Sequence, residues 1–168
     1  HTLPDCYAHA PLRDYGDKLI MQSFADMHLH APQYPMLGMG MDLPLLDWLN
    51  TYTFPQEARY EDTEFAKEAY SIFTEDMKKS PNTRACIFGT LHVPATEILM
   101  EQLDKTGIKA MVGKVNMDRN GSPQLQEESA QASADATVQW IKDTLDKFEN
   151  VKPILTPRFT PSCSDALM

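Results

Sequence analysis

The sequence has few positive charges: 15 Lys and Arg stand against 24 Asp and Glu, which gives a formal net charge of −9 over 168 residues. No basic run is longer than Lys78-Lys79. Nucleic-acid binders normally carry a basic stripe that replaces the counterions of the polyanion. We therefore expect no nucleic-acid partner and, for the same reason, no binding to an anionic membrane surface.

Long apolar runs and cysteines are also scarce. No stretch approaches the roughly 20 apolar residues that a membrane-spanning helix needs, and no basic segment followed by an apolar core opens the chain. Cys6, Cys86 and Cys163 are too few and too widely spaced for a disulfide scaffold or a Cys-rich zinc site. Cys86 lies in an apolar run and is interpreted as a small buried side chain. Together these absences predict a soluble, cytoplasmic protein.

What the chain does have is a regular alternation of extended and helical patterns after about residue 20. A hydrophobic fraction of 42% predicts one folded domain of ordinary composition. Alternation of this kind is typical of βαβ units and a parallel sheet. It fits either a doubly wound α/β sheet or half of a (β/α)₈ barrel, and periodicity does not separate the two. The expected strands are residues 20–30, 84–92, 108–115 and 151–156, and the expected helices are 42–48, 61–79, 94–107 and 129–149.

Two of these elements carry further expectations. The helix from Asp42 to Trp48 should have Asp42 as its N-cap and should turn Leu45, Leu46 and Leu49 inward. The run from Arg84 to His92 is mostly apolar and short, which is typical of a strand buried on both faces.

His28 and His30 are two residues apart on the first expected strand, so their imidazoles should project from one face and could reach one metal ion. The pair ends an apolar strand before a Pro/Gly-rich loop, which is where a parallel α/β fold places its active site. Two solvent-facing or hydrogen-bonded histidines are the alternative. His92 ends the next expected strand and is either a third ligand or a polar residue lining the same mouth.

Arg158 and Phe159 follow the last expected strand. A guanidinium beside an aromatic ring can hold a flat heterocycle, with one group donating and the other stacking. Alternatively, Arg158 pairs with a surface carboxylate and Phe159 packs in the core. Gln33, three residues after His30, has an amide able to read donor and acceptor edges, although alone it would mean nothing.

From about residue 18 to the end, the sequence closely resembles the guanine deaminases, a family of the amidohydrolase superfamily. Two stretches distinguish this family from amidohydrolases that share only His-x-His: Leu-Pro-Leu-Leu-Asp-Trp-Leu and Thr-Pro-Arg-Phe. The resemblance is carried by residues 28–34 (HLHAPQY), 42–49 (DLPLLDWL), 51–55 (TYTFP), 112–118 (VGKVNMD) and 151–164 (VKPILTPRFTPSCS).

The resemblance implies a zinc-dependent (β/α)₈ barrel that hydrolyses the exocyclic amine of guanine to give xanthine and ammonia. His28 and His30 match the two zinc ligands of the first strand. Gln33 and Arg158 match the purine-contacting residues, and Phe159 matches the aromatic beside the base. On this resemblance His30 is also counted among the substrate-binding residues.

The family's other zinc ligands and its proton-shuttling glutamate are expected beyond residue 168. We expect residues 1–18 to be the end of a small flanking β-domain and residues 19–168 to be the N-terminal half of the barrel, with about four strands. On this interpretation the 168-residue chain alone is inactive and the complete protein is a homodimer. Two alternatives stay open: an amidohydrolase acting on another aminated or halogenated heterocycle, and a non-catalytic purine-binding module.

Overall fold

The computed structural model describes residues 4–168 and contains a parallel sheet of four strands. A second, two-stranded parallel sheet continues beyond it. The alternation of strands and helices predicted from the sequence is confirmed, and with it the α/β class. The four strands, in spatial order, are β1 (Phe24–His30), β2 (Asn82–Phe88), β3 (Lys109–Gly113) and β5 (Val151–Pro153); the short pair is β4 (Val115–Asn116) and β6 (Thr156–Pro157).

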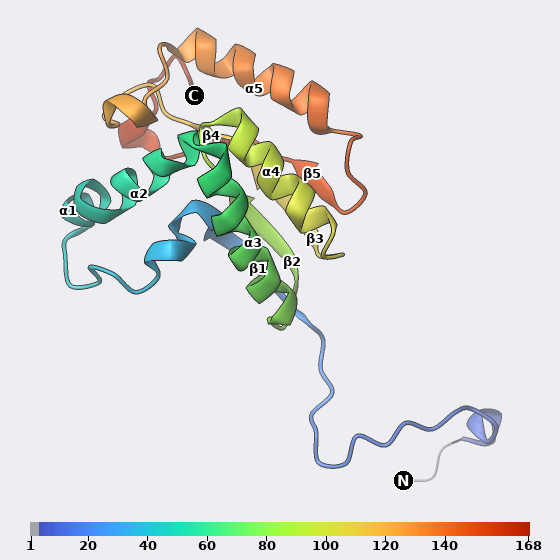
Figure 1. Ribbon diagram of the computed structural model, residues 1–168. Helices are drawn as coiled ribbons and strands as arrows, with labels where there is room; N and C mark the ends of the chain where they lie inside the picture. The colour runs from blue at the N-terminus through green and yellow to red at the C-terminus, as the bar shows by residue number, and fades with distance from the viewer. Residues whose placement is uncertain (1–3) are drawn as a thin grey trace.

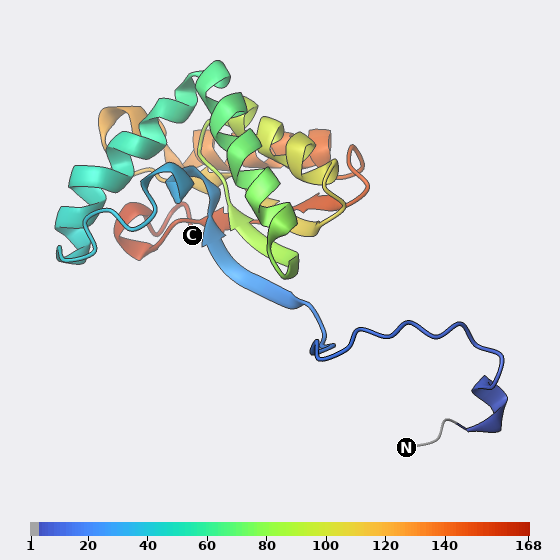
Figure 2. The ribbon, with the colours of Figure 1, turned by 60° about the horizontal axis from the view of Figure 1, so that its bottom comes forward.

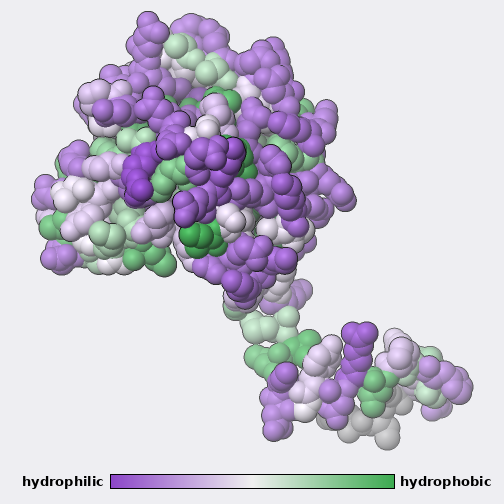
Figure 3. All heavy atoms as spheres, viewed as in Figure 1, coloured by the Kyte–Doolittle hydropathy of each residue, from purple (hydrophilic) through white to green (hydrophobic). Residues whose placement is uncertain are grey.

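Three long helices cover one face of the large sheet: α3 (Thr63–Lys79), α4 (Val93–Asp104) and α5 (Ala130–Thr144) (Figures 1 and 2). Their outward surface is mainly hydrophilic (Figure 3). None of the helices in residues 4–168 is both long and apolar enough to cross a membrane. The remaining helical segments are α1 (Leu45–Trp48), a π-helical turn (Leu49–Thr53), α2 (Phe54–Ala58) and 3₁₀ turns at Asp5–Tyr7, Ala31–Met36, Arg59–Glu61, Pro123–Leu125 and Thr160–Ser162.

The main core lies between these helices and the sheet. Ile87 of β2, Val112 of β3 and Val151 of β5 are fully buried against it, together with Leu99 of α4 and Trp140 of α5. Burying a side chain of this size stabilises the fold by about 1.5–3 kcal/mol. The core therefore fixes the strands in parallel, with their carboxyl ends at one edge.

The other face of the sheet is covered by no helix of the described residues. Cys86 is half-buried there, and with Met27 and Met111 it lines a hollow of about 370 Å³. The expectation that the strand in residues 84–92 is buried on both faces is therefore wrong, and Cys86, interpreted from the sequence as a small buried side chain, is only partly buried. β2 alternates instead, because helices pack on one side of it only.

The starts of the long helices were predicted to within two residues, and two of the three helices, α3 and α5, begin with a side-chain cap. The Asp62 carboxylate accepts hydrogen bonds from Glu64 N (2.9 Å) and Phe65 N (3.4 Å), which satisfies free N–H groups of α3. Ser129 Oγ likewise accepts from Ala132 N (3.1 Å) at the start of α5. The end of α5 was predicted five residues too late, at Glu149 rather than Thr144.

The segment after residue 41 differs most from expectation. The helix begins at Leu45, with Pro44 rather than Asp42 in the N-cap position. Leu45 and Leu46 are each 62% exposed, so the prediction that they face inward is wrong, while Leu49 is buried as predicted. Both leucines lie in α1, before the π-helical turn whose first residue, Leu49, is the first buried side chain of this helical segment.

The described part of the N-terminal segment, residues 4–23, runs away from the body as an arm and forms no strand (Figures 1 and 2). The strand predicted from Ile20 begins at Phe24. Residues 1–3 lie outside the described part of the chain. That residues 1–18 end a small β-domain stays a prediction.

Candidate functional site

An open cavity of about 430 Å³ lies at the carboxyl ends of the strands. His28, His30, Gln33, Arg158 and Phe159 all line it. Strands β1 and β5 are at opposite edges of the sheet, yet residues that end or follow them converge here. The structure thus brings together these five residues, which were singled out from the sequence as metal or substrate contacts; periodicity alone could not establish that they meet.

A β-bulge in β1 sets the histidine pair. Asp26 is paired with Ala85 and Leu29 with Ile87, so Met27 and His28 together oppose one residue of β2. Bulges of this kind re-aim side chains and are frequent beside active sites. The bulge directly precedes the end of the strand, where the second histidine of the pair lies.

The two imidazole rings lie close together over Phe88. Their centroids are 5.2 Å apart, and the Phe88 ring is stacked at 4.6 Å from His30 and edge-on at 5.0 Å from His28. Burial, followed by the charges of Arg158 and His28, lowers the pKa of His30 to about 3. His30 is therefore neutral at physiological pH, which is the form of imidazole that binds metals.

The donor set at the cavity fits part of a metal site. His30 Nδ1 is buried without a hydrogen-bond partner, which leaves a lone pair or an N–H unsatisfied. Within residues 4–168, however, no group of three or more His, Cys, Asp and Glu side chains is placed to hold a metal ion. A catalytic zinc site needs about three protein ligands, so the histidine pair alone does not complete such a site.

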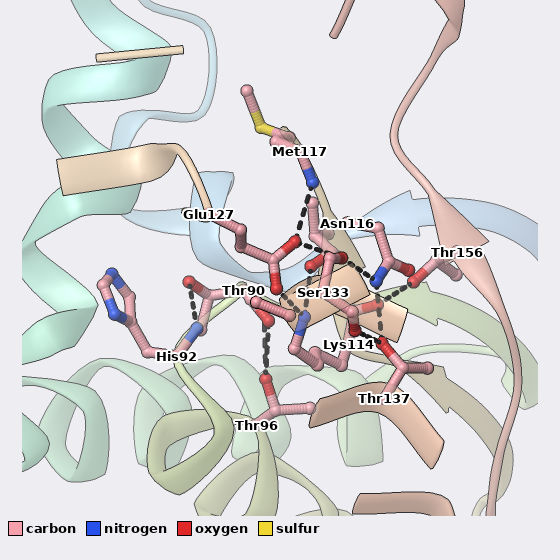
Figure 4. Close-up of polar contacts among 12 residues, drawn as sticks. Thr90, His92, Thr96, Lys114, Asn116, Met117, Glu127, Ser133, Thr137 and Thr156 are labelled. Atoms are coloured by element: carbon pink, nitrogen blue, oxygen red, sulfur yellow. Dashed lines mark hydrogen bonds and ion pairs between the residues drawn. The ribbon is translucent and has the colours of Figure 1, made fainter. Parts of the chain in front are cut away.

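His92 does not join the pair. It precedes the first residue of α4, does not line the cavity, and its ring points away from the neighbouring polar groups in Figure 4. Both sequence interpretations of His92, as a third ligand and as a residue of the same mouth, are therefore unsupported. The strand that was expected to carry it to the site ends four residues earlier, at Phe88.

Arg158 makes a buried, two-pronged ion pair with Glu57. Its Nη1 bonds to Glu57 Oε2 and its Nη2 to Glu57 Oε1 (3.0 Å), and the side chains are 4% and 3% exposed. Gln33 Nε2 donates to the same Oε1 at 3.0 Å. Arg158 does pair with a carboxylate, as the alternative interpretation had it, but with an interior one beside the cavity. Phe159 is half-buried and packs against the cluster that contains Leu49.

Glu57 was not identified from the sequence, although a signal was present. Leu49, Thr53, Phe54 and Glu57 share the buried face of one helical segment, where a lone carboxylate needs a cationic partner. The helix between them is widened into a π-turn, in which Phe54 N–H donates to Leu49 O. Pro55 has no N–H to give to the carbonyl four residues earlier, which accounts for the wider turn.

A second polar cluster surrounds β4, the strand that accepts a backbone hydrogen bond from Arg158. The cluster is drawn in Figure 4. Lys114 Nζ pairs with Oε1 of Glu127. The other carboxylate oxygen of Glu127, Oε2, accepts hydrogen bonds from Met117 N (3.1 Å) and Ser133 Oγ (2.5 Å). Burial lowers the pKa of Lys114, and Glu127 opposes that shift. The cluster locks the end of β3 and the start of β4 to the segment before α5.

Asn116 links that cluster to the cavity. Its Nδ2 donates to Ser133 Oγ and Thr137 Oγ1, each at 2.7 Å, and its carbonyl oxygen accepts from Arg158 N at 3.2 Å. These bonds also explain why α5 buries a stripe of hydroxyl groups rather than Val138, which is 51% exposed. Gly113 permits the close pairing, because a Cβ there would lie 2.1 Å from Thr156 Oγ1.

Comparisons with known proteins agree with this geometry. The chain is 42% identical over 165 residues to the guanine deaminase of Rattus norvegicus and 43% identical over 156 residues to that of Dictyostelium discoideum. Among solved structures, it matches guanine deaminase from C. acetobutylicum with bound guanine in the active site, with 45% identity and a TM-score of 0.89 over 99% of this chain.

The comparisons also set the extent of the match. The chain spans about 36% of the length of the rat protein and 39% of the solved C. acetobutylicum chain. Its four-stranded sheet is accordingly part of an amidohydrolase barrel, which settles the choice between a doubly wound sheet and half of a barrel. The profile of the amidohydrolase family matches residues 19–168. The chain therefore belongs to the amidohydrolase family.

Proposed function

We propose that the protein containing this chain is a guanine deaminase, which hydrolyses guanine to xanthine and ammonia. The observation that carries the proposal is the convergence of His28, His30, Gln33, Arg158 and Phe159 on one cavity. The similarity to guanine deaminases, one of them solved with guanine bound, supports the same substrate.

The cavity offers the contacts that a flat purine needs. The Arg158 guanidinium donates to an acceptor on the edge of the base, the Gln33 amide satisfies a second polar edge, and Phe159 supplies an aromatic surface. Trp48 and Leu49 complete an apolar wall that excludes water from the base. Burying a purine's polar atoms without partners costs about 1–3 kcal/mol per group, so these few side chains determine which base is held.

The same cavity suits a zinc ion on its histidine side. His28 and His30 would hold zinc through neutral imidazole, and the ion when bound supplies Lewis-acid activation of water at neutral pH. The described residues provide no third ligand, so the remaining ligands and the group that protonates the leaving amine belong to parts of the protein outside these residues. In the net reaction, water adds at the carbon that bears the amine and ammonia leaves.

The organisation of the protein is proposed on the same basis. Residues 1–18 end a small flanking β-domain and residues 19–168 form the N-terminal half of the barrel. The complete protein is a cytoplasmic homodimer. Gel filtration with light scattering on the full-length gene product measures the oligomeric state, and a monomer at micromolar concentration would contradict the dimer.

The deaminase proposal is tested with the full-length gene product. Ammonia and xanthine should form from guanine, stop after zinc is removed with a chelator, and resume when zinc is restored. His28→Ala should lose both bound zinc and turnover. His9→Ala is the matched control, because His9 is exposed on the arm. Absence of ammonia from guanine in the zinc-loaded protein, with another aminated heterocycle hydrolysed instead, would contradict the proposal.

A further inference from the structure

The carboxylate of Glu57 receives three hydrogen bonds from two side chains that line the cavity. Two come from the Arg158 guanidinium and one from Gln33 Nε2. Glu57 itself is 2% exposed and does not line the cavity. It therefore contacts both Gln33 and Arg158 on the side away from the cavity and does not face the ligand.

These contacts fix the direction of the Gln33 amide. A carboxylate held by a guanidinium is ionised and can only accept, so the Gln33 amide nitrogen must face Glu57. The amide oxygen then lies at the opposite end of the group, and within the described residues it makes no hydrogen bond of its own. The orientation follows from charge, and does not depend on telling nitrogen from oxygen by shape.

The Arg158 fork is divided in a similar way. A guanidinium carries five N–H donors, and two of them are used on Glu57. The other donors have no acceptor among the described residues, and Arg158 lines the cavity, so these donors are available to a ligand. One side of the cavity thus presents an acceptor from Gln33 and donors from Arg158.

We propose that Glu57 is a positioning residue that sets the polarity of this recognition edge. An acceptor beside donors is complementary to a lactam edge, in which an N–H lies next to a C=O. Guanine has such an edge at N1–H and O6. The inference rests on the proposed function and specifies which feature of the substrate the cavity selects.

2-Aminopurine is the discriminating probe. It keeps the purine ring and the 2-amino group that would be hydrolysed, but it has no oxygen at C6 and its N1 carries a lone pair instead of a hydrogen. The Gln33 oxygen would face that lone pair, and the Arg158 donors would lose their acceptor. A site that hydrogen-bonds a polar group rejects the analogue that lacks it, because its own groups are left unpaired.

Glu57→Gln in the full-length gene product tests the proposal. The amide introduced by this substitution can donate as well as accept, so the Gln33 amide is free to turn and present its nitrogen to N1 of 2-aminopurine. The ratio of kcat/KM for guanine to that for 2-aminopurine should fall about ten-fold or more, mainly through KM. Glu127→Gln is the matched control: it makes the same chemical change in the enclosed pair with Lys114, and should leave the ratio unchanged.

A second variant covers the possibility that Glu57→Gln fails to fold. Gln33→Met keeps the size of the side chain and leaves the Glu57–Arg158 pair intact, yet removes the oriented oxygen. It should lower the same ratio. A ratio that stays at the wild-type value in Glu57→Gln, or in Gln33→Met where Glu57→Gln does not fold, would overturn the inference.

The inference and the proposed function fail in different ways. Turnover of guanine with an unchanged ratio in the variants overturns the role of Glu57 alone. If the wild-type protein turns over neither purine, the proposed function fails, and the ratio of the two Kd values from calorimetry replaces the kinetic ratio. A Kd ratio that is equal in wild type and variants, or no binding of either purine, overturns the positioning role as well.

Discussion

Two buried ion pairs in this protein have similar chemistry and different surroundings. Glu57–Arg158 lies beside the cavity and joins residues 101 positions apart, whereas Lys114–Glu127 is enclosed and joins residues 13 apart. In the enclosed pair the protein itself supplies partners: Val115 O accepts from Lys114 Nζ at 3.2 Å. In the cavity pair, donors are left over for a ligand.

The comparison separates structural from recognition roles. A lysine is a compact point charge with three donors, and in the enclosed cluster two of them bond to fixed protein acceptors. The planar fork of Arg158 can bind Glu57 with two N–H groups and offer others to a flat base. We therefore expect changes to Lys114–Glu127 to act on stability, and changes around Arg158 to act on substrate recognition.

The largest effect is expected for Glu127→Ala, which leaves Lys114 buried without its counter-ion. Removing one partner of a buried pair costs about 3–5 kcal/mol, because the remaining charge is uncompensated. Guanidinium-induced unfolding of the full-length gene product measures the loss. A change of less than about 1 kcal/mol would show that water reaches Lys114 and that the pair is not structural.

Arg158→Lys should come next, and should act on activity. The positive charge toward Glu57 is kept while the planar fork is lost, so kcat/KM for guanine should fall about 100-fold, with a smaller loss in the free energy of unfolding. Steady-state kinetics on guanine checks the first quantity and denaturant unfolding the second. Wild-type kcat/KM in this variant would make Arg158 a structural residue.

Gln33→Ala should have an intermediate effect. It removes one polar partner of the base and one of the three bonds to Glu57, while the Glu57–Arg158 pair remains. A loss of about ten-fold in kcat/KM is expected from a missing hydrogen bond. If the loss is matched by an equal loss in 2-aminopurine turnover, the residue packs the cavity without reading the base.

The smallest effect is expected at an exposed pair, Lys147–Glu97, which sets a baseline for the two buried ones. Lys147 Nζ lies 2.7 Å from Glu97 Oε2, but the side chains are 50% and 30% exposed. Exposed pairs contribute about 0.2–1 kcal/mol, so Lys147→Ala should change the unfolding free energy by no more than that. A loss of unfolding free energy as large as that of Glu127→Ala would contradict the account, because burial would then not explain why the enclosed ion pair contributes more than the exposed one.

Much of the fold followed from local signals in the sequence. The alternation of extended and helical patterns located the long helices, because these patterns depend on neighbouring residues only. The π-turn before Phe54 was missed, since it arises where a proline removes a hydrogen bond inside a longer helix. The exposure of β2 on the face of the sheet that carries Cys86 was also missed. Burial of a strand depends on which of its faces the rest of the fold covers.

The site shows the same division. The histidine pair could be found from its two-residue spacing at a strand end, and Arg158 and Phe159 from their place after the last strand. Glu57 and Glu127 could not be assigned as partners, because each pair is made by the tertiary fold. A buried charge predicts that a partner exists, but only the fold identifies it.

The most direct test of the account is a crystal structure of the full-length gene product with guanine. We expect the base in the cavity at the strand ends, with an Arg158 N–H and the Gln33 amide oxygen about 2.7–3.2 Å from its lactam edge. Guanine in the larger hollow of about 540 Å³ lined by Asn50 and Gln124, or guanine that leaves Arg158 and Gln33 bound to Glu57 alone, would contradict it.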